Sequence, residues 1–198
     1  MLRRSKFTQG INTSIWLAAV ICCIGASFYF YDYFLQSLPG IINLDLLKDL
    51  QIDASDLGIL SATYFLAYTP MQLVAGLLYD RYGSRVLLTI MISICALGAV
   101  VFSFSNGLFM ASFGRILMGL SSAFAWVCAL GLISNWFNKH LFAILTGLVQ
   151  SLSCLGAVSA AIPLVILFHQ FGWKKTTFYI GLFGFFLGII IFLIVRDR

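Results

Sequence analysis

The chain has 198 residues, of which 61% are hydrophobic and only 10% are charged. This composition lies outside the range of soluble globular domains. The formal net charge is +5, but the sequence contains no basic-aromatic binding module, so nucleic acid is excluded as the expected partner. It also lacks a Walker loop, a dinucleotide-binding glycine pattern and a nucleophile elbow, so neither an enzyme nor an ATP-driven pump is expected.

Six apolar runs are each long enough to cross a bilayer core of roughly 30 Å. They cover approximately residues 14–36, 57–78, 86–105, 108–133, 141–168 and 176–195. We therefore predict an all-α membrane protein with six transmembrane helices, in which residues 1–198 form one transmembrane domain. The first run is too long for the h-region of a signal peptide and carries Asp32, which argues against a cleavable leader.

The basic residues predict the orientation of these helices. With the N-terminus in the cytoplasm, eight of them lie inside and three lie outside, which satisfies the positive-inside rule. The inside set is Arg3, Arg4, Lys6, Arg81, Arg85, Lys139, Arg196 and Arg198, and the outside set is Lys48, Lys174 and Lys175. Both termini are therefore expected to be cytoplasmic.

The first run carries an acid within an aromatic segment, and Pro39 is expected to end its helix. Tyr29, Asp32 and Gln36 share one helical face. An ionisable side chain within a membrane span is costly and normally faces a bundle interior or a watery cavity. We expect Asp32 to face a cavity, and the alternative is a hydrated position at the outer interface among tyrosines.

The second run has a polar stripe of Tyr64, Tyr68 and Gln72 at successive i+4 steps, and Pro70 interrupts it. Ser55 and Asp56 are expected to cap this helix. A tyrosine stripe is common in helix packing, whereas the depth of Gln72 favours the lining of a cavity.

A short charged turn joins the second and third runs. Arg81 and Arg85 would hold this turn in the cytoplasm, Gly83 would permit its sharp reversal, and Gly76 would let another helix approach closely. Asp80 would lie at a helix end, where it can pair with an arginine or with the N-terminus of a neighbouring helix. The alternative is a loop that only determines topology.

The fourth run contains Gly114-Arg115-x-x-x-Gly119. Arg115 lies roughly 12 Å below the preceding turn, where a permanent charge needs a carboxylate, backbone carbonyls or cavity water. Trp126 continues the face of Arg115, and Gln150 lies among small residues of the fifth run. We expect Arg115 to line a cavity, and the alternative is that it snorkels to the outer surface.

The pattern G-x-L-x-D-R-x-G-x-R-x-x-L that begins at Gly76 resembles the cytoplasmic signature loop of major facilitator superfamily transporters, although Ser84 stands where that family often has a basic residue. The whole chain resembles the amino-terminal, six-helix half of such a transporter. It is further similar to the phagosomal nutrient transporter family of intracellular bacteria, and more distantly to lysosomal dipeptide uniporters. The phagosomal resemblance rests on residues 29–36, 57–62, 68–72 and 172–174.

The resemblance implies secondary active transport of a small polar nutrient (an amino acid, a nucleoside or a dipeptide-like solute) by a symporter or uniporter in a bacterial inner membrane. Proton coupling is one option, with Asp32 as the protonatable or amine-binding group and Arg115 as the partner of a substrate carboxylate or of Asp32. The implied substrate or coupling residues are Tyr29, Asp32, Gln36, Tyr68, Gln72, Arg115, Trp126 and Gln150. The implied gating residues are Gly76, Asp80, Arg81, Gly83 and Arg85. No catalytic residue, metal or cofactor is implied.

The family has twelve helices in two halves, with the substrate site between them. The implied partners are therefore a small-molecule substrate, membrane lipid and a second six-helix half, present as a separate chain or through self-association. The chain could be a fragment, a split-gene product or a functional half. The competing function is a non-transporting membrane subunit or a remnant of a split transporter gene.

Overall fold

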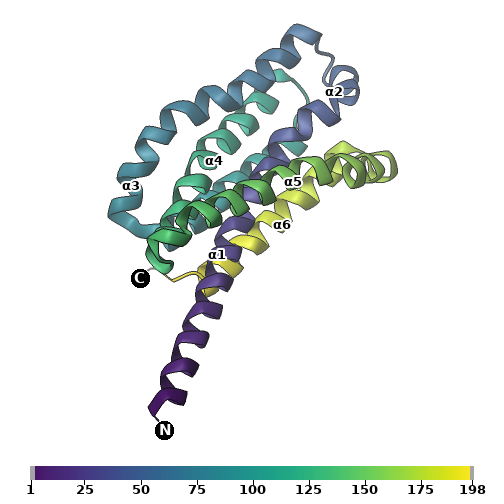
Figure 1. Cartoon of the computed structure of the whole chain (residues 1–198). Helices are drawn as coiled ribbons and strands as arrows, with labels where there is room; N and C mark the ends of the chain where they lie inside the picture. Colours follow the sequence, from purple (N-terminus) through teal and green to yellow (C-terminus); the bar gives the residue numbers. More distant parts are fainter. Residues whose placement is uncertain (1–2, 197–198) are drawn as a thin grey trace.

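The computed structural model describes the backbone of residues 3–196 and the side chains of residues 16, 18–158 and 164–196. The regular elements of that part are helices, in the order α1 (Arg3–Ile41), α2 (Asn43–Asp49), α3 (Ala54–Ser103), α4 (Leu108–Trp136), α5 (Lys139–Phe171) and α6 (Trp173–Ile194). All of them except α2 are long and apolar enough to span a membrane, which makes five. Figure 1 shows one bundle, with the first turns of α1 projecting beyond it.

The 50-residue helix α3 consists of two arms that meet at Gly83, whose φ of 74° and ψ of 174° are not helical. Both arms pack against α4. A Cβ on Gly119 would collide with the backbone of Tyr64, and Gly98 of the second arm touches Gly114. Tyr64 and Gly98 are 34 residues apart, a separation of about 50 Å in a straight helix. The chain therefore turns back at Gly83, as Figure 1 also shows, and glycine provides the positive φ that this turn requires.

Helix α4 occupies the centre of the bundle, and two facing glycines let α3 reach its backbone. A Cβ on Gly98 would lie 2.8 Å from the carbonyl oxygen of Gly114, and a Cβ on Gly114 would lie 2.9 Å from that of Gly98. Real Cβ atoms do not come so close to a backbone oxygen, so larger residues would separate the two helices. Both glycines of the sequence Gly114-Arg115-x-x-x-Gly119 therefore allow α3 to pack closely on α4.

Helix α1 extends beyond the predicted span 14–36, and it continues through Pro39 to Ile41. The prediction that Pro39 ends this helix is wrong. Proline removes one backbone donor and frees the carbonyl four residues earlier, which usually disrupts a helix unless another group satisfies that carbonyl. The carbonyl in question belongs to Leu35, and its partner is described with the site below.

The expected cap of the next helix is also displaced. Asp53, rather than Ser55 or Asp56, is the N-cap of α3, because its carboxylate accepts the backbone N–H of Asp56 at 2.8 Å. The Asp56 carboxylate in turn accepts the backbone N–H of Asp53, which completes a capping box. Residues Asn43–Asp49, which precede this cap, form the separate short helix α2 with Leu46 buried.

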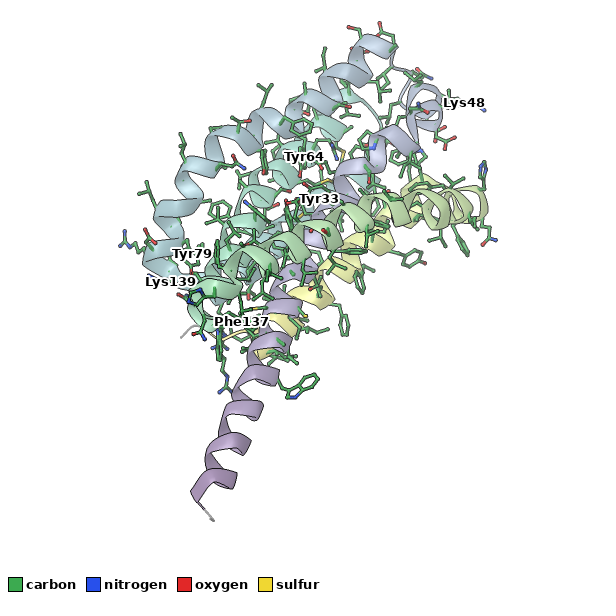
Figure 2. All side chains as sticks on the ribbon, viewed as in Figure 1. Tyr33, Lys48, Tyr64, Tyr79, Phe137 and Lys139 are labelled. Carbon is green, nitrogen blue, oxygen red and sulfur yellow. The ribbon has the colours of Figure 1, made fainter. Side chains whose placement is uncertain are left out.

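The two ends of the bundle carry different sets of basic residues. Figure 2 shows Lys48 at one end and Lys139 at the other. At the Lys48 end, Trp173 donates its Nε1–H to the Oδ2 atom of Asp49 at 2.8 Å, and its ring centroid lies 5.6 Å from that of Phe102. This buried tryptophan therefore ties the start of α6 to α2 and α3.

The contact between Gly98 and Gly114 predicts an asymmetry between two glycine substitutions. Gly114→Leu should lower the thermal stability of the protein in detergent micelles, since overpacking typically costs about 1–3 kcal/mol. Gly147→Leu is the matched control, because nothing lies within 4 Å of the Cβ position of Gly147. Circular dichroism during heating measures both variants. Equal melting temperatures for the two variants would contradict the close contact at Gly114.

Candidate functional site

Asp32 lies inside the bundle, with 3% of its surface exposed, and two hydroxyl groups from other helices donate hydrogen bonds to it. The Tyr64 hydroxyl of α3 donates to Oδ1 at 2.9 Å, and the Ser122 hydroxyl of α4 donates to the same oxygen. Within the described part of the chain, no hydrogen bond reaches Oδ2. Asp32 is therefore shielded from solvent and links three helices.

Arg115 is 2% exposed and lies beside this cluster. Its guanidinium carbon is 4.7 Å from the centroid of the Tyr64 ring, a cation–π contact. Tyr64 thus contacts Arg115 through its ring and Asp32 through its hydroxyl. Among the contacts of the described residues, none is an ion pair between Arg115 and Asp32. The burial of Arg115 also excludes snorkelling to the surface.

Arg115 instead replaces the backbone donor that Pro39 lacks. In a regular helix the carbonyl of residue 35 accepts the N–H of residue 39, and proline has no N–H. Nη1 of Arg115 donates to the Leu35 carbonyl oxygen at 3.0 Å. The same nitrogen lies 3.9 Å from the sulfur of Met118, while the buried Nε atom has no partner among the described residues. One arginine of α4 therefore stabilises an interrupted turn of α1.

A second polar cluster lies between α1, α4 and α5. The Tyr29 hydroxyl donates to Oε1 of Gln150 at 3.0 Å, and Nε2 of Gln150 donates to the Tyr33 hydroxyl at 3.2 Å. The ring centroid of Tyr29 is 5.1 Å from that of Trp126 and 4.9 Å from that of Tyr33. Figure 2 shows Tyr33 and Tyr64 near the middle of the bundle. These four side chains (Tyr29, Tyr33, Trp126 and Gln150) are called the aromatic wall below.

The predicted polar stripe of α3 continues from the first cluster toward the surface. The rings of Tyr64 and Tyr68 stack with their centroids 6.1 Å apart, and Nε2 of Gln72 donates to the Tyr68 hydroxyl at 2.6 Å. Tyr64 is fully buried whereas Gln72 is exposed. Gln36 is half-buried, and its side chain makes no hydrogen bond within the described part of the chain.

The structure adds three residues to those predicted for the site. Tyr64, which was predicted only as part of a polar stripe, and Ser122 are the hydrogen-bond donors to Asp32. Tyr33 is missing from the predicted set, although its i+4 spacing from Tyr29 could have identified it. The two hydroxyl donors had no such signal, because their approach to Asp32 depends on how separate helices align.

In the turn at Gly83, the arginines have partners other than the expected acid. Nε of Arg85 donates to the Phe192 carbonyl of α6 at 2.9 Å, and its guanidinium lies 4.5 Å from the Phe192 ring centroid. Arg81 lies 5.4 Å from the ring centroid of Tyr82. Asp80 is exposed and pairs with neither arginine in the part of the chain that the structure describes.

Gly76 was expected to let another helix approach closely. In this structure nothing lies within 4 Å of its Cβ position. The first arm of α3 presents Leu73 and Leu77 outward next to this glycine, with 81% and 73% of their surface exposed. The face that includes Gly76 is therefore uncovered, and no described helix packs closely on it.

The relation between Pro39 and Arg115 predicts an energetic coupling between two substitutions. Arg115→Met leaves the Leu35 carbonyl without a donor, a loss worth about 1–3 kcal/mol for a buried group. In a Pro39→Ala background the backbone N–H of residue 39 can replace the lost donor. Arg115→Met should therefore be less destabilising there, by about 1 kcal/mol or more.

Unfolding of the purified variants by sodium dodecyl sulfate in mixed micelles measures this coupling. The control background is Pro70→Ala, because Pro70 also lies within a helix, α3, and makes none of the described contacts of Arg115. An additive double mutant of Pro39 and Arg115 would contradict the proposed replacement of the donor.

Comparison with known proteins places these features in a family. The chain is 25% identical over 198 residues to the probable L-galactonate transporter of Escherichia coli (strain K12), covering 100% of this chain and 42% of the relative. It is 24% identical to the hexuronate transporter of Bacillus subtilis (strain 168), covering 76% of this chain and 36% of the relative. It is 23% identical to the nitrate/nitrite transporter NrtP of a Picosynechococcus species, covering 60% of this chain and 22% of the relative.

The chain therefore spans less than half the length of these relatives. These relatives are named as transporters and not as enzymes. Together with the apolar helices, they indicate that the chain is an integral membrane protein related to transporters. The sequence profile of the Major Facilitator Superfamily matches residues 15–198, and the chain thus belongs to this superfamily of membrane transporters.

Proposed function

We propose that this chain forms a six-helix half of a twelve-helix secondary transporter and that it carries a small polar nutrient across the bacterial inner membrane. The reversal at Gly83 supports six spans, because it divides α3 into two arms of 29 and 20 residues on either side of that glycine. Each arm is long enough to cross most or all of a bilayer core. With α1, α4, α5 and α6, the arms supply six segments.

The second half is proposed to pack on the least buried helices, α5 and the first arm of α3. On α5 the outward positions Leu148, Leu155 and Val158 are between 60% and 71% exposed. The first arm of α3 carries Leu77 and the exposed Gln72 on adjoining surface. Polar and apolar groups side by side suit a helix that lines a substrate path and also meets a partner helix.

The names of the relatives favour a sugar acid as the substrate class. L-Galactonate and hexuronate are polyhydroxylated carboxylates, whereas no relative reported above is named for an amino acid, a nucleoside or a dipeptide. The aromatic wall supports this choice, because phenol and amide groups both donate and accept hydrogen bonds. The wall therefore offers a polyhydroxylated solute several neutral partners and flat aromatic surfaces.

Asp32 is proposed to carry the coupling proton, and this buried acid is the observation on which the proposed mechanism depends. Both of its hydrogen bonds end on Oδ1, so a proton on Oδ2 would remove the charge without displacing either donor. The hydrogen bond of Arg115 goes to the Leu35 carbonyl and its guanidinium lies over the Tyr64 ring, without an ion pair to Asp32 in the described residues. Arg115 is accordingly proposed to position α1 and Tyr64.

Uptake of ¹⁴C-labelled D-glucuronate and L-galactonate by a bacterial host without its own sugar-acid transport tests this function. Cells that express the chain together with a second six-helix half should accumulate one of these solutes, and a protonophore should abolish the accumulation. Asp32→Asn should reduce it by about tenfold, the size of a typical coupling between sites. Asp45→Asn, a change to an exposed acid on α2, is the control and should behave as wild type.

Two outcomes would contradict this proposal. Wild-type accumulation by Asp32→Asn would remove the proton-carrying role from Asp32. Absence of uptake for every sugar acid tested, with both halves present in the membrane, would favour a non-transporting subunit.

The six-span arrangement is tested separately by reporter fusions. Alkaline phosphatase and green fluorescent protein fused after Arg198 should report a cytoplasmic C-terminus, and the same reporters inserted at Asp49 should report an external loop. The excess of basic residues on one side gives this orientation its physical reason. Finding both positions on the same side of the membrane would contradict six spans.

A further inference from the structure

A groove of about 710 Å³ follows the seam between α1 and α6. Thr176, Tyr179, Phe183 and Leu187 line it from α6, and the α1 side chains opposite them include Phe34, Phe30 and Ser27. The α6 residues from Thr176 to Leu187 span about 17 Å, which is close to the depth of one leaflet of the bilayer core. The groove is mainly apolar and follows the direction of a lipid acyl chain.

A second hollow of about 380 Å³ lies between the α3–α4 turn and the first turns of α6, and Tyr179 lines both it and the groove. Its other lining residues are Ser103, Phe104, Asn106, Lys174, Lys175 and Phe178, none of which is acidic. Nζ of Lys174 donates to Oδ1 of Asn106 at 2.9 Å and lies 5.5 Å from the Trp173 ring centroid. The ammonium group is therefore held in place with N–H donors to spare, beside the exposed Lys175.

We propose that this seam binds one anionic phospholipid, with its phosphate against Lys174 and Lys175 and one acyl chain in the groove between α1 and α6. Lysines at a membrane boundary attract anionic headgroups, and the apolar groove gives the adjoining chain a shaped surface. Tyr179 and Phe183, at the rim, are 63% and 56% exposed, so the lipid can enter from the bilayer. The site requires only that the chain lies in a membrane, and it is independent of the transported solute.

Native mass spectrometry of the full chain in detergent micelles tests the site. Palmitoyl-oleoyl phosphatidylglycerol should bind about tenfold more tightly than phosphatidylcholine with the same chains, because two lysines face the net negative charge. The double substitution Lys174→Gln and Lys175→Gln should reduce phosphatidylglycerol affinity to that of phosphatidylcholine. Lys139→Gln, which changes an exposed lysine at the opposite end, should leave it unchanged.

Separate substitutions test whether the groove holds an acyl chain. Ser27→Phe should fill the groove and weaken the binding of palmitoyl-oleoyl phosphatidylglycerol while sparing dihexanoyl phosphatidylglycerol. The serine hydroxyl bonds only within its own helix, to the Ile24 carbonyl, and Leu187→Phe provides a second variant that narrows the same groove. Circular dichroism identifies the variants that retain their helices.

Soluble glycerol phosphate distinguishes a lipid site from a simple phosphate site, and it should not compete with the lipid at equal concentration. Equal affinities for the two long-chain lipids, or unchanged binding after loss of both lysines, would overturn the headgroup assignment. Unchanged binding of the long-chain lipid by folded Ser27→Phe and Leu187→Phe variants would overturn the groove assignment.

Discussion

The bundle depends on how a permanent positive charge is accommodated in its apolar interior. Arg115 forms no ion pair with Asp32 in the described structure; it binds the Leu35 carbonyl and lies over the Tyr64 ring. Both partners are available for structural reasons. Pro39 leaves the carbonyl without its usual backbone donor, and the ring of Tyr64 is held by the hydrogen bond from its hydroxyl to Asp32. The arginine thereby fixes α1 against α4 at the level of the buried acid, so the position of Asp32 follows from the contacts of Arg115.

Close helix packing makes this arrangement possible. Gly114 precedes Arg115 and touches the second arm of α3, while Gly119 follows it by just over one turn and touches the backbone of Tyr64 in the first arm. A larger residue at either position would move an arm outward. Tyr64 could then no longer contact Asp32 and Arg115 together. The two glycines and the arginine therefore act as one unit: the glycines set the distance between helices, and that distance decides which groups can satisfy the charge.

Sequence patterns predicted several features that depend on one helix, although the end of α1 and the N-cap of α3 were predicted wrongly. The apolar runs, the shared face of Tyr29 and Asp32 and the reversal at Gly83 all follow from local periodicity or from the conformational freedom of glycine. The features that depend on alignment between helices could not be read in this way. The partner of Arg115 follows from a proline on another helix, 76 positions earlier. Likewise, Arg85 bonds to the carbonyl of Phe192, 107 residues away, and in the described part of the chain it does not pair with Asp80, five residues before it. A charge pattern in sequence identifies which groups need a partner, and the packing of the bundle then selects it.

The separation of the charged cluster from the aromatic wall has a consequence for the proposed transport of an acid. The wall presents neutral groups, and the neighbouring Arg115 is covered by the ring of Tyr64. A substrate carboxylate must therefore be met by a cation of the second half, or it must draw Arg115 past that ring. In the second case Tyr64 would move and its hydrogen bond to Asp32 would break. An ionised Asp32 would lose one of its two donors, whereas a protonated Asp32 would lose less, because it has no charge to stabilise. Substrate binding and protonation would then favour each other through a single tyrosine, which is the reciprocal coupling that a proton symporter requires.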